Sequence, residues 1–294
     1  MYTFIQSAIS GLLMGGVYAV IAMGLSLIFG VMKLVNFAHG DFLMAFCFLA
    51  WAIITNLNID PYLAILIVAP ISFAIGYLFQ KFLVNGILRR EKNVESPNIR
   101  LFTVGFAWCL SNLALLVFGA NIRATQTAYK GKTFFIGDYM FSIPRLIAFG
   151  IALVVTVALF LFLYKTETGR ALRAISQNRF TARLMGINVE KLYCVAFGLG
   201  IAVVGVSACL IVPFYSVFPT MGATFGLRSF VIVVLGGMGN LPGALISGLV
   251  VGLIEAFVGT YISTTYASMI IFIVFIIALV VRSTSWFQNR SRKI

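Results

Sequence analysis

The sequence predicts an all-α protein that crosses a membrane several times. Its mean hydropathy is +1.05 and only 10% of its 294 residues are charged, which argues against an ordinary soluble domain. Several segments also exceed the roughly 18 nearly uncharged apolar residues that suggest a bilayer-spanning helix. We therefore expect a polytopic helical bundle of about eight or nine spans, formed as a single transmembrane domain over residues 1–294.

Nine candidate spans follow one another along the chain. They lie near residues 5–31, 42–57, 61–84, 101–119, 144–164, 192–213, 225–238, 241–258 and 267–282. The N-terminus lacks the basic region and cleavage site of a signal peptide, so we expect the first stretch to remain as a membrane helix. The stretches 42–57 and 225–238 are short for a span, which fits a tilted helix, a broken helix or half of a re-entrant hairpin.

Capping residues and glycines add detail to these helices. Asp60 before Pro61, and Asn240 two residues before Pro242, each predict an N-cap followed by proline in the first turn. Small residues four apart let helix backbones approach closely inside a membrane. We therefore expect tight packing at three pairs, which are Gly11 and Gly15, Gly239 and Gly243, and Gly248 and Gly252.

Charge asymmetry orients the chain. The most basic stretch, residues 165–191, carries six Lys or Arg against two Glu. Placing it in the cytoplasm, with alternating spans, also puts Lys33, the segment 81–100 and the C-terminal tail inside, for sixteen basic residues on this side. The opposite side receives Arg123, Lys130, Lys132 and Arg145, with Arg228 at or near that face. This imbalance predicts an outside N-terminus and a cytoplasmic C-terminus.

The basic stretch 165–191 predicts two short cytoplasmic helices. Thr166 is a suitable N-cap with Glu167 in the first turn, and Asn178 could cap a second helix. Gly186 stands where a helix C-terminus favours a left-handed residue. Such an element could let a soluble partner push on the membrane part. The alternative is a basic loop that only fixes topology.

Two polar features interrupt the apolar spans. Asn36-Phe37-Ala38-His39-Gly40-Asp41 forms a polar break near the cytoplasmic end of the first span, and we prefer a structural role for His39 over a proton relay. Glu255 is an ionisable group in an apolar segment, so it should face the bundle interior or water and find a partner. Arg228 is a possible partner, and both structural pairing and a part in translocation remain open.

Other sequence features argue against several classes of function. The chain has no HExxH or GxSxG motif, and Gln126 stands where a phosphate-binding loop ending in Gly131-Lys132-Thr133 needs glycine. The basic residues cluster at span ends, without the aromatic-interleaved patch that binds nucleic acid. The missing motifs lead us to expect no catalytic residue. We also expect no metal site or disulfide, because the four cysteines lie in apolar stretches without CxxC spacing. They are Cys47, Cys109, Cys194 and Cys209.

Three blocks in order along the chain resemble one family of membrane proteins. They are GGVYAVIAMGLSLIFGVMKLVNFAHGDF at 15–42, TGRALRAISQNRFTARLMGINVEKL at 168–192 and VLGGMGNLPGALISGLVVGLIEAF at 234–257. Over nearly its whole length the chain is similar to permease subunits of bacterial ABC importers for branched-chain amino acids, in the subgroup that carries the first of two paired permeases. Permeases for urea and short amides share much of this pattern. The tail at 282–287 departs from the Pro-Gly-containing close usual in the family.

The resemblance implies a type II importer permease of the bacterial inner membrane whose segment 169–186 docks into a cleft on an ATP-binding subunit. Coupling to that subunit is expected at Gly169, Arg170, Arg173, Asn178, Ala182, Arg183 and Gly186. The implied partners are a second related permease, two cytoplasmic ATP-binding subunits and an extracytoplasmic substrate-binding protein. ATP and Mg²⁺ would then be bound by partner subunits, with no cofactor in this chain.

The substrate path is expected at the glycine-rich turn and the polar break, where backbone groups not used in helices could face a cavity. The candidate residues are Asn36, His39, Gly236, Gly237, Gly239, Asn240 and Glu255. Because a tight site would stall release, we expect a mostly apolar conduit without a deep charged pocket. Two other functions remain open: an ion- or proton-coupled carrier, disfavoured by the few intramembrane charges, and a passive channel for small neutral solutes such as urea.

Overall fold

The chain folds into a helical bundle with the composition of a membrane protein. A computed structural model describes residues 2–90, 97–125, 131–136 and 139–283. The helices are α1 (Tyr2–Met32), α2 (His39–Leu57), α3 (Ile65–Phe79), the π-helical turn η1 (Gln80–Val84), α4 (Asn85–Arg90), α5 (Pro97–Phe118), α6 (Ile143–Lys165), α7 (Glu167–Gln177), α8 (Arg179–Leu184), α9 (Val189–Ile211), α10 (Met221–Gly236), α11 (Leu241–Tyr261) and α12 (Thr264–Ser283).

The helices confirm the polytopic prediction and refine it. In the described part of the chain, seven helices are long and apolar enough to cross a membrane, and α10 and α12 supply two shorter apolar ones. The stretch near 42–57 becomes the 19-residue α2, so it is not short. The stretch near 225–238 becomes the 16-residue α10, which stays short for a span. The candidate at 61–84 is a continuous run of α3, η1 and α4.

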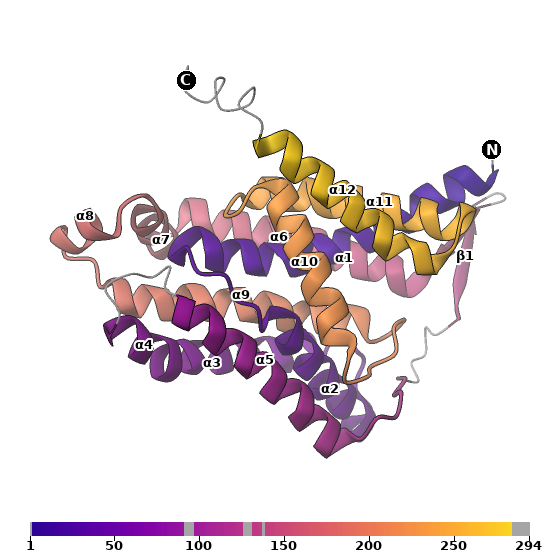
Figure 1. Cartoon of the computed structure of the whole chain (residues 1–294). Coiled ribbons are helices and arrows are strands. Elements are labelled where there is room, and N and C mark those ends of the chain that lie inside the picture. Colours follow the sequence, from indigo (N-terminus) through magenta and orange to yellow (C-terminus); the bar gives the residue numbers. More distant parts are fainter. Residues whose placement is uncertain (1, 91–96, 126–130, 137–138, 284–294) are drawn as a thin grey trace.

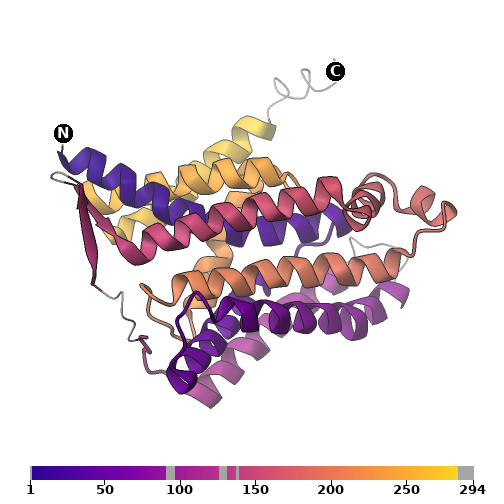
Figure 2. The same ribbon diagram turned by 180° about the vertical axis from the view of Figure 1, so that it is seen from behind.

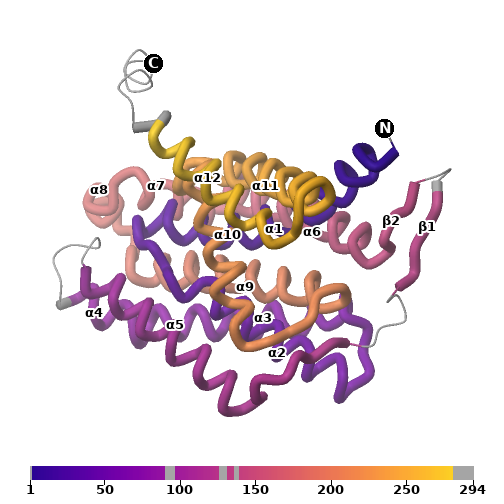
Figure 3. The backbone as a smooth tube through the Cα atoms, turned by 45° about the vertical axis from the view of Figure 1, so that its right-hand side comes forward, coloured from indigo at the N-terminus to yellow at the C-terminus, as the bar shows by residue number. Residues whose placement is uncertain are grey.

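Helix α1 lies at the centre of the bundle, where it packs against α6, α9, α10 and α11. Figures 1 and 3 show α6, α11 and α12 beside α1 on one side, with α9, α3, α2 and α5 on the other and α10 crossing between them. From behind, α6 covers α1, and α9 runs below it (Figure 2). Both α1 and α9 are buried over most of their length, which explains why they are apolar on all sides.

The chain builds opposite ends with different elements. Helices α7 and α8 project at one end of the bundle, and a hairpin of β1 (Thr133–Ile136) and β2 (Tyr139–Ser142) lies at the other, beside the start of α1 (Figures 1 and 3). The side chain of Gln6 holds this hairpin, because its amide donates to the carbonyl of Met140 at 2.6 Å. The hairpin was not predicted from the sequence.

Glycines set the closest helix contacts, as the spacing predicted. A Cβ at Gly15 on α1 would lie 2.8 Å from the Cα of Leu249 on α11, so only glycine fits there. Gly11 approaches Gly252 in the same interface. Between α1 and α9, a Cβ at Gly24 would lie 2.6 Å from the carbonyl oxygen of Gly200. The backbones of α1, α9 and α11 therefore touch without intervening side chains.

The polar break reaches deeper into the bundle than we expected. His39 Nε2 lies 2.9 Å from the carbonyl oxygen of Ile21 on α1. Ile21 precedes the end of α1 at Met32 by eleven residues, about 16 Å at 1.5 Å per residue. The segment after α1 thus turns back along the bundle, and α2 begins inside it. The Asp41 carboxylate, in the first turn of α2, accepts a hydrogen bond from Ser111 at 2.6 Å.

The two predicted helix starts have different outcomes. Asn240 caps α11, because its side-chain oxygen accepts from the Gly243 amide at 3.2 Å. Asp60 instead accepts from the Tyr62 amide at 2.9 Å and caps a turn over residues 61–64. Helix α3 begins only at Ile65, so this predicted start is four residues too early.

Candidate functional site

The segment 165–191 is folded as two capped helices, as its sequence predicted. Thr166 Oγ1 accepts from the Gly169 amide at 3.0 Å and caps α7. Asn178 Oδ1 accepts from the amides of Phe180 and Thr181 at 2.9 and 3.1 Å and caps α8. Gly186 follows α8 with a φ of +82°, in the left-handed region. A loop that served only topology would not need this series of caps and turns.

The inner side of α7 is fixed to the bundle. A Cβ at Gly169 would lie 2.6 Å from the Cα of Leu163, so α7 starts directly against the end of α6. Leu172 and Ile175 are buried, as is Ala182 on α8. The Arg173 guanidinium lies 4.7 Å from the centre of the Tyr164 ring, an energetically favourable cation–π contact. Helix α7 is therefore packed directly against the end of α6.

The outer side of α8 is apolar and uncovered. Phe180, Leu184 and Met185 are 69, 72 and 78% exposed at the tip of the projection. Basic side chains accompany them: Arg170 is 58% exposed and only weakly paired with Glu167 at 3.7 Å, and Arg183 is exposed. Large exposed apolar side chains within a basic surface are typical of a protein-binding surface.

The predicted glycine-rich turn lies beside α7. Gly237 and Gly239 both have positive φ, and Gly239 packs against Gly30 near the end of α1. A cavity of about 220 Å³ lies at this junction. Its walls include Ser26 and Gly30 from α1, Arg173 and Ser176 from α7, and Gly239 and Asn240 from the turn. The structure thus brings together candidates that the sequence assigned separately to coupling and to the path.

The other predicted path residues lie apart from this junction. Asn36 and His39 are 2% and 1% exposed inside the bundle, and their part in a path stays a prediction. Glu255 lies on α11, where one carboxylate oxygen is 2.8 Å from Arg228. The two side chains are only 23 and 14% exposed. The Tyr18 hydroxyl accepts from the same Arg228 at 2.8 Å, so the predicted partner of Glu255 is confirmed and a third member is added.

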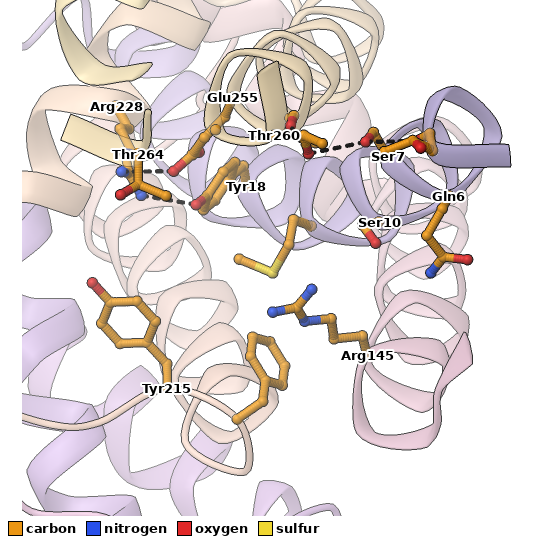
Figure 4. Close-up of a pocket in the computed structure, with 16 residues that line it drawn as sticks. Gln6, Ser7, Ser10, Tyr18, Arg145, Tyr215, Arg228, Glu255, Thr260 and Thr264 are labelled. Carbon is orange, nitrogen blue, oxygen red and sulfur yellow. Dashed lines mark hydrogen bonds and ion pairs between the residues drawn. The ribbon is translucent and has the colours of Figure 1, made fainter. Parts of the chain in front are cut away.

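This trio forms part of the wall of a second cavity, at the hairpin end of the bundle (Figure 4). The cavity encloses about 610 Å³. Side chains from α1, α6, α10, α11, α12 and the segment after α9 line it, and the charged ones are Arg145, Arg228 and Glu255. The expectation of a mostly apolar substrate conduit without a deep charged pocket stays a prediction. The sequence could not bring these charged residues together, because residues far apart in sequence, such as Tyr18 and Arg228, meet only in the fold.

Sequence reasoning also missed Arg145, Ser10 and Gln6 as site residues. Arg145 entered only the count of basic residues on each side of the membrane, and Ser10 and Gln6 lie in an apolar span of α1. The signal that could have found them is the spacing of small polar groups on α1, because Gln6, Ser10 and Thr3 recur every three or four residues and share one helix face.

Comparison with known proteins places the chain in a family. A sequence profile described as "Branched-chain amino acid transport system / permease component" matches residues 7–279. The chain belongs to this family. The match includes α7, α8 and most residues of the large cavity. No solved structure shows a significant match to the chain.

Named relatives in the permease family align along most of their length. The high-affinity branched-chain amino acid transport system permease protein BraD of Pseudomonas aeruginosa is 29% identical, over 96% of this chain and 95% of BraD. The permease protein LivH of Escherichia coli K12, from a transport system described in the same words, is 30% identical over 96% of this chain and 94% of LivH. A probable LivH of Methanocaldococcus jannaschii is 26% identical over 78% of this chain and 72% of that protein.

Proposed function

We propose that this chain is a transmembrane permease subunit of a binding-protein-dependent ABC importer for branched-chain or other hydrophobic amino acids. The observation that carries the proposal is the family match over residues 7–279. The projecting α7–α8 unit supports it, because it is anchored to the bundle on one side and presents exposed apolar and basic residues on the other. Such a unit suits a subunit that receives force from a soluble ATPase.

The proposed assembly has a type II architecture in the bacterial inner membrane. It contains this chain, a second related permease, two cytoplasmic ATP-binding subunits and an extracytoplasmic substrate-binding protein. ATP and Mg²⁺ are bound by the partner subunits, and this chain carries no catalytic residue. The N-terminus and the hairpin face outward, and α7, α8 and the C-terminus face the cytoplasm, which agrees with the excess of basic residues on that side.

Transport in sealed vesicles tests this function. The assembled importer should accumulate leucine only when ATP, the ATP-binding subunits and the binding protein are all present. Accumulation driven by a proton gradient would show a carrier instead. Equilibration of urea without ATP would show a channel.

Gly186→Pro should uncouple ATP hydrolysis from uptake while the subunit still reaches the membrane. The φ of +82° at this position is incompatible with proline, which requires a φ near −65°, so α8 would be displaced relative to α9. Gly186→Asn is the matched control, because asparagine tolerates the left-handed region. We expect a loss of leucine uptake of about tenfold or more in the proline variant and near-normal uptake in the asparagine variant. Equal uptake by both variants would contradict the proposed coupling role.

A further inference from the structure

The large cavity contains a cation that has no anionic or hydrogen-bond partner among the residues that the structure describes. Arg145 lies in the first turn of α6, and no other described residue forms a hydrogen bond or ion pair with its guanidinium. The guanidinium carbon lies 5.8 Å from the centre of the Phe214 ring, and Figure 4 shows the group pointing into the cavity. A guanidinium has five N–H donors in a fixed fork, which suits a bidentate carboxylate.

The charges around the cavity leave one positive charge uncompensated. Arg228 is neutralised by Glu255 at 2.8 Å and also donates to the Tyr18 hydroxyl. Among the described lining residues, Arg145 is then the surplus charge. The cavity therefore favours an occupant that carries an anionic group over one that has none.

The remaining walls fit a small amphipathic molecule. Met14 and Phe214 contribute apolar surface to the cavity wall, and the Phe214 ring lies beside Arg145. Glu255 also lies in the cavity wall, where one carboxylate oxygen pairs with Arg228 and the other is buried without a hydrogen-bond partner among the described residues. The accessible walls therefore offer a partner for a carboxylate in Arg145 and an apolar surface for an aliphatic side chain. The volume of about 610 Å³ is within the range of roughly 300–1,000 Å³ typical of small-molecule sites.

We propose that this cavity is a binding site for a small aliphatic amino acid, in which Arg145 pairs with the α-carboxylate. The choice of an amino acid over another carboxylate rests on the proposed function. Arg145 is only half-buried, so solvent weakens the pair. A weak site is compatible with onward release of the substrate.

Site-directed labelling in the assembled importer tests the site directly, without ATP and without the binding protein. Ser10→Cys places a thiol in the cavity wall, and Cys109→Ser removes the one exposed native cysteine among the four. The rate of reaction with a small neutral maleimide is measured with leucine or leucinamide present. Leucine should slow the reaction several-fold, and leucinamide, which lacks the carboxylate, should not.

One arginine variant and one lysine variant in the same background test whether Arg145 causes the protection by leucine. Arg145→Gln should remove the protection by leucine and reduce the uptake of leucine by about tenfold or more, the loss expected for a charge-assisted hydrogen bond. Lys132→Gln is the matched control, because it removes an exposed positive charge beside the hairpin, at the same end of the bundle, and Lys132 does not line the cavity. It should leave both protection and uptake unchanged.

Three results would overturn the inference. They are equal protection by leucinamide and leucine, retained protection in Arg145→Gln, and stronger protection by 4-methylpentanoate, which would assign the site to a simple carboxylate. If the Arg145→Gln variant does not assemble, the comparison of leucine with leucinamide in the protein that retains Arg145 still shows whether the cavity recognises the carboxylate. The proposed function fails separately, when the assembled importer with its binding protein shows no ATP-driven leucine uptake.

Discussion

Replacing Gly15 by leucine should nearly abolish the folded protein in the membrane. A Cβ at this position would lie 2.8 Å from the Cα of Leu249 and 2.9 Å from the carbonyl oxygen of Gly248, so the clash is with the backbone of α11. Overpacking a core against movable side chains costs about 1–3 kcal/mol, and backbone atoms of a packed helix yield less easily. We therefore expect a larger loss here, because α1 and α11 would have to separate.

Gly150→Leu is the control for this experiment. Gly150 lies on α6, is exposed, and a Cβ there meets nothing within 4 Å. The yield of monodisperse protein after extraction from the membrane, measured by size-exclusion chromatography, should fall strongly for Gly15→Leu and stay near normal for Gly150→Leu. A similar yield for both variants would mean that the α1–α11 contact does not determine stability.

Arg228→Met should destabilise the subunit severely, and adding Glu255→Gln should restore part of the loss. The single substitution leaves a largely buried carboxylate without its cation. Breaking a buried pair costs about 3–5 kcal/mol, and the partial exposure of these two side chains makes that range an upper limit. The double variant removes the remaining charge, so thermal unfolding of the purified protein should show strong coupling between the two positions.

The exposed pair of Arg89 and Glu190 provides the comparison. Its side chains are 71 and 40% exposed at a distance of 2.7 Å, so Arg89→Met should cost only about 0–1 kcal/mol. If Arg228→Met is no more destabilising than Arg89→Met, the ion pair in the cavity is not structural. A normally assembled Glu255→Gln variant with a shifted pH optimum for transport would make Glu255 a titrating part of the mechanism instead.

The sequence was sufficient for features that depend on local chemistry. Hydropathy located the helices, and the caps at Thr166, Asn178 and Asn240 appear where the residue types indicated them. Glycine spacing also predicted close packing, although it did not say which helices meet. Local signals were misleading at Asp60, because an aspartate before proline caps an isolated turn as readily as a helix.

Features that depend on distant residues could not be predicted. The Arg228–Glu255 pair was proposed because a membrane carboxylate needs a partner, but the role of Tyr18 and the free guanidinium of Arg145 depend on the packing of α1, α6, α10 and α11. The position of His39 deep in the bundle could not be predicted either, since a short polar segment does not indicate that the chain turns back into the bundle.

The length and rigidity of α1 have a mechanical consequence. Ser10, Met14 and Tyr18 of this helix line the larger cavity, and Ser26 and Gly30 line the smaller one beside α7. The contact of Gly24 with Gly200 lies between the two groups. An unbroken helix of 31 residues is about 46 Å long and resists compression. If α1 pivots at Gly24, its two ends move in opposite directions. One rigid helix would then open one cavity to its side of the membrane while it closes the other.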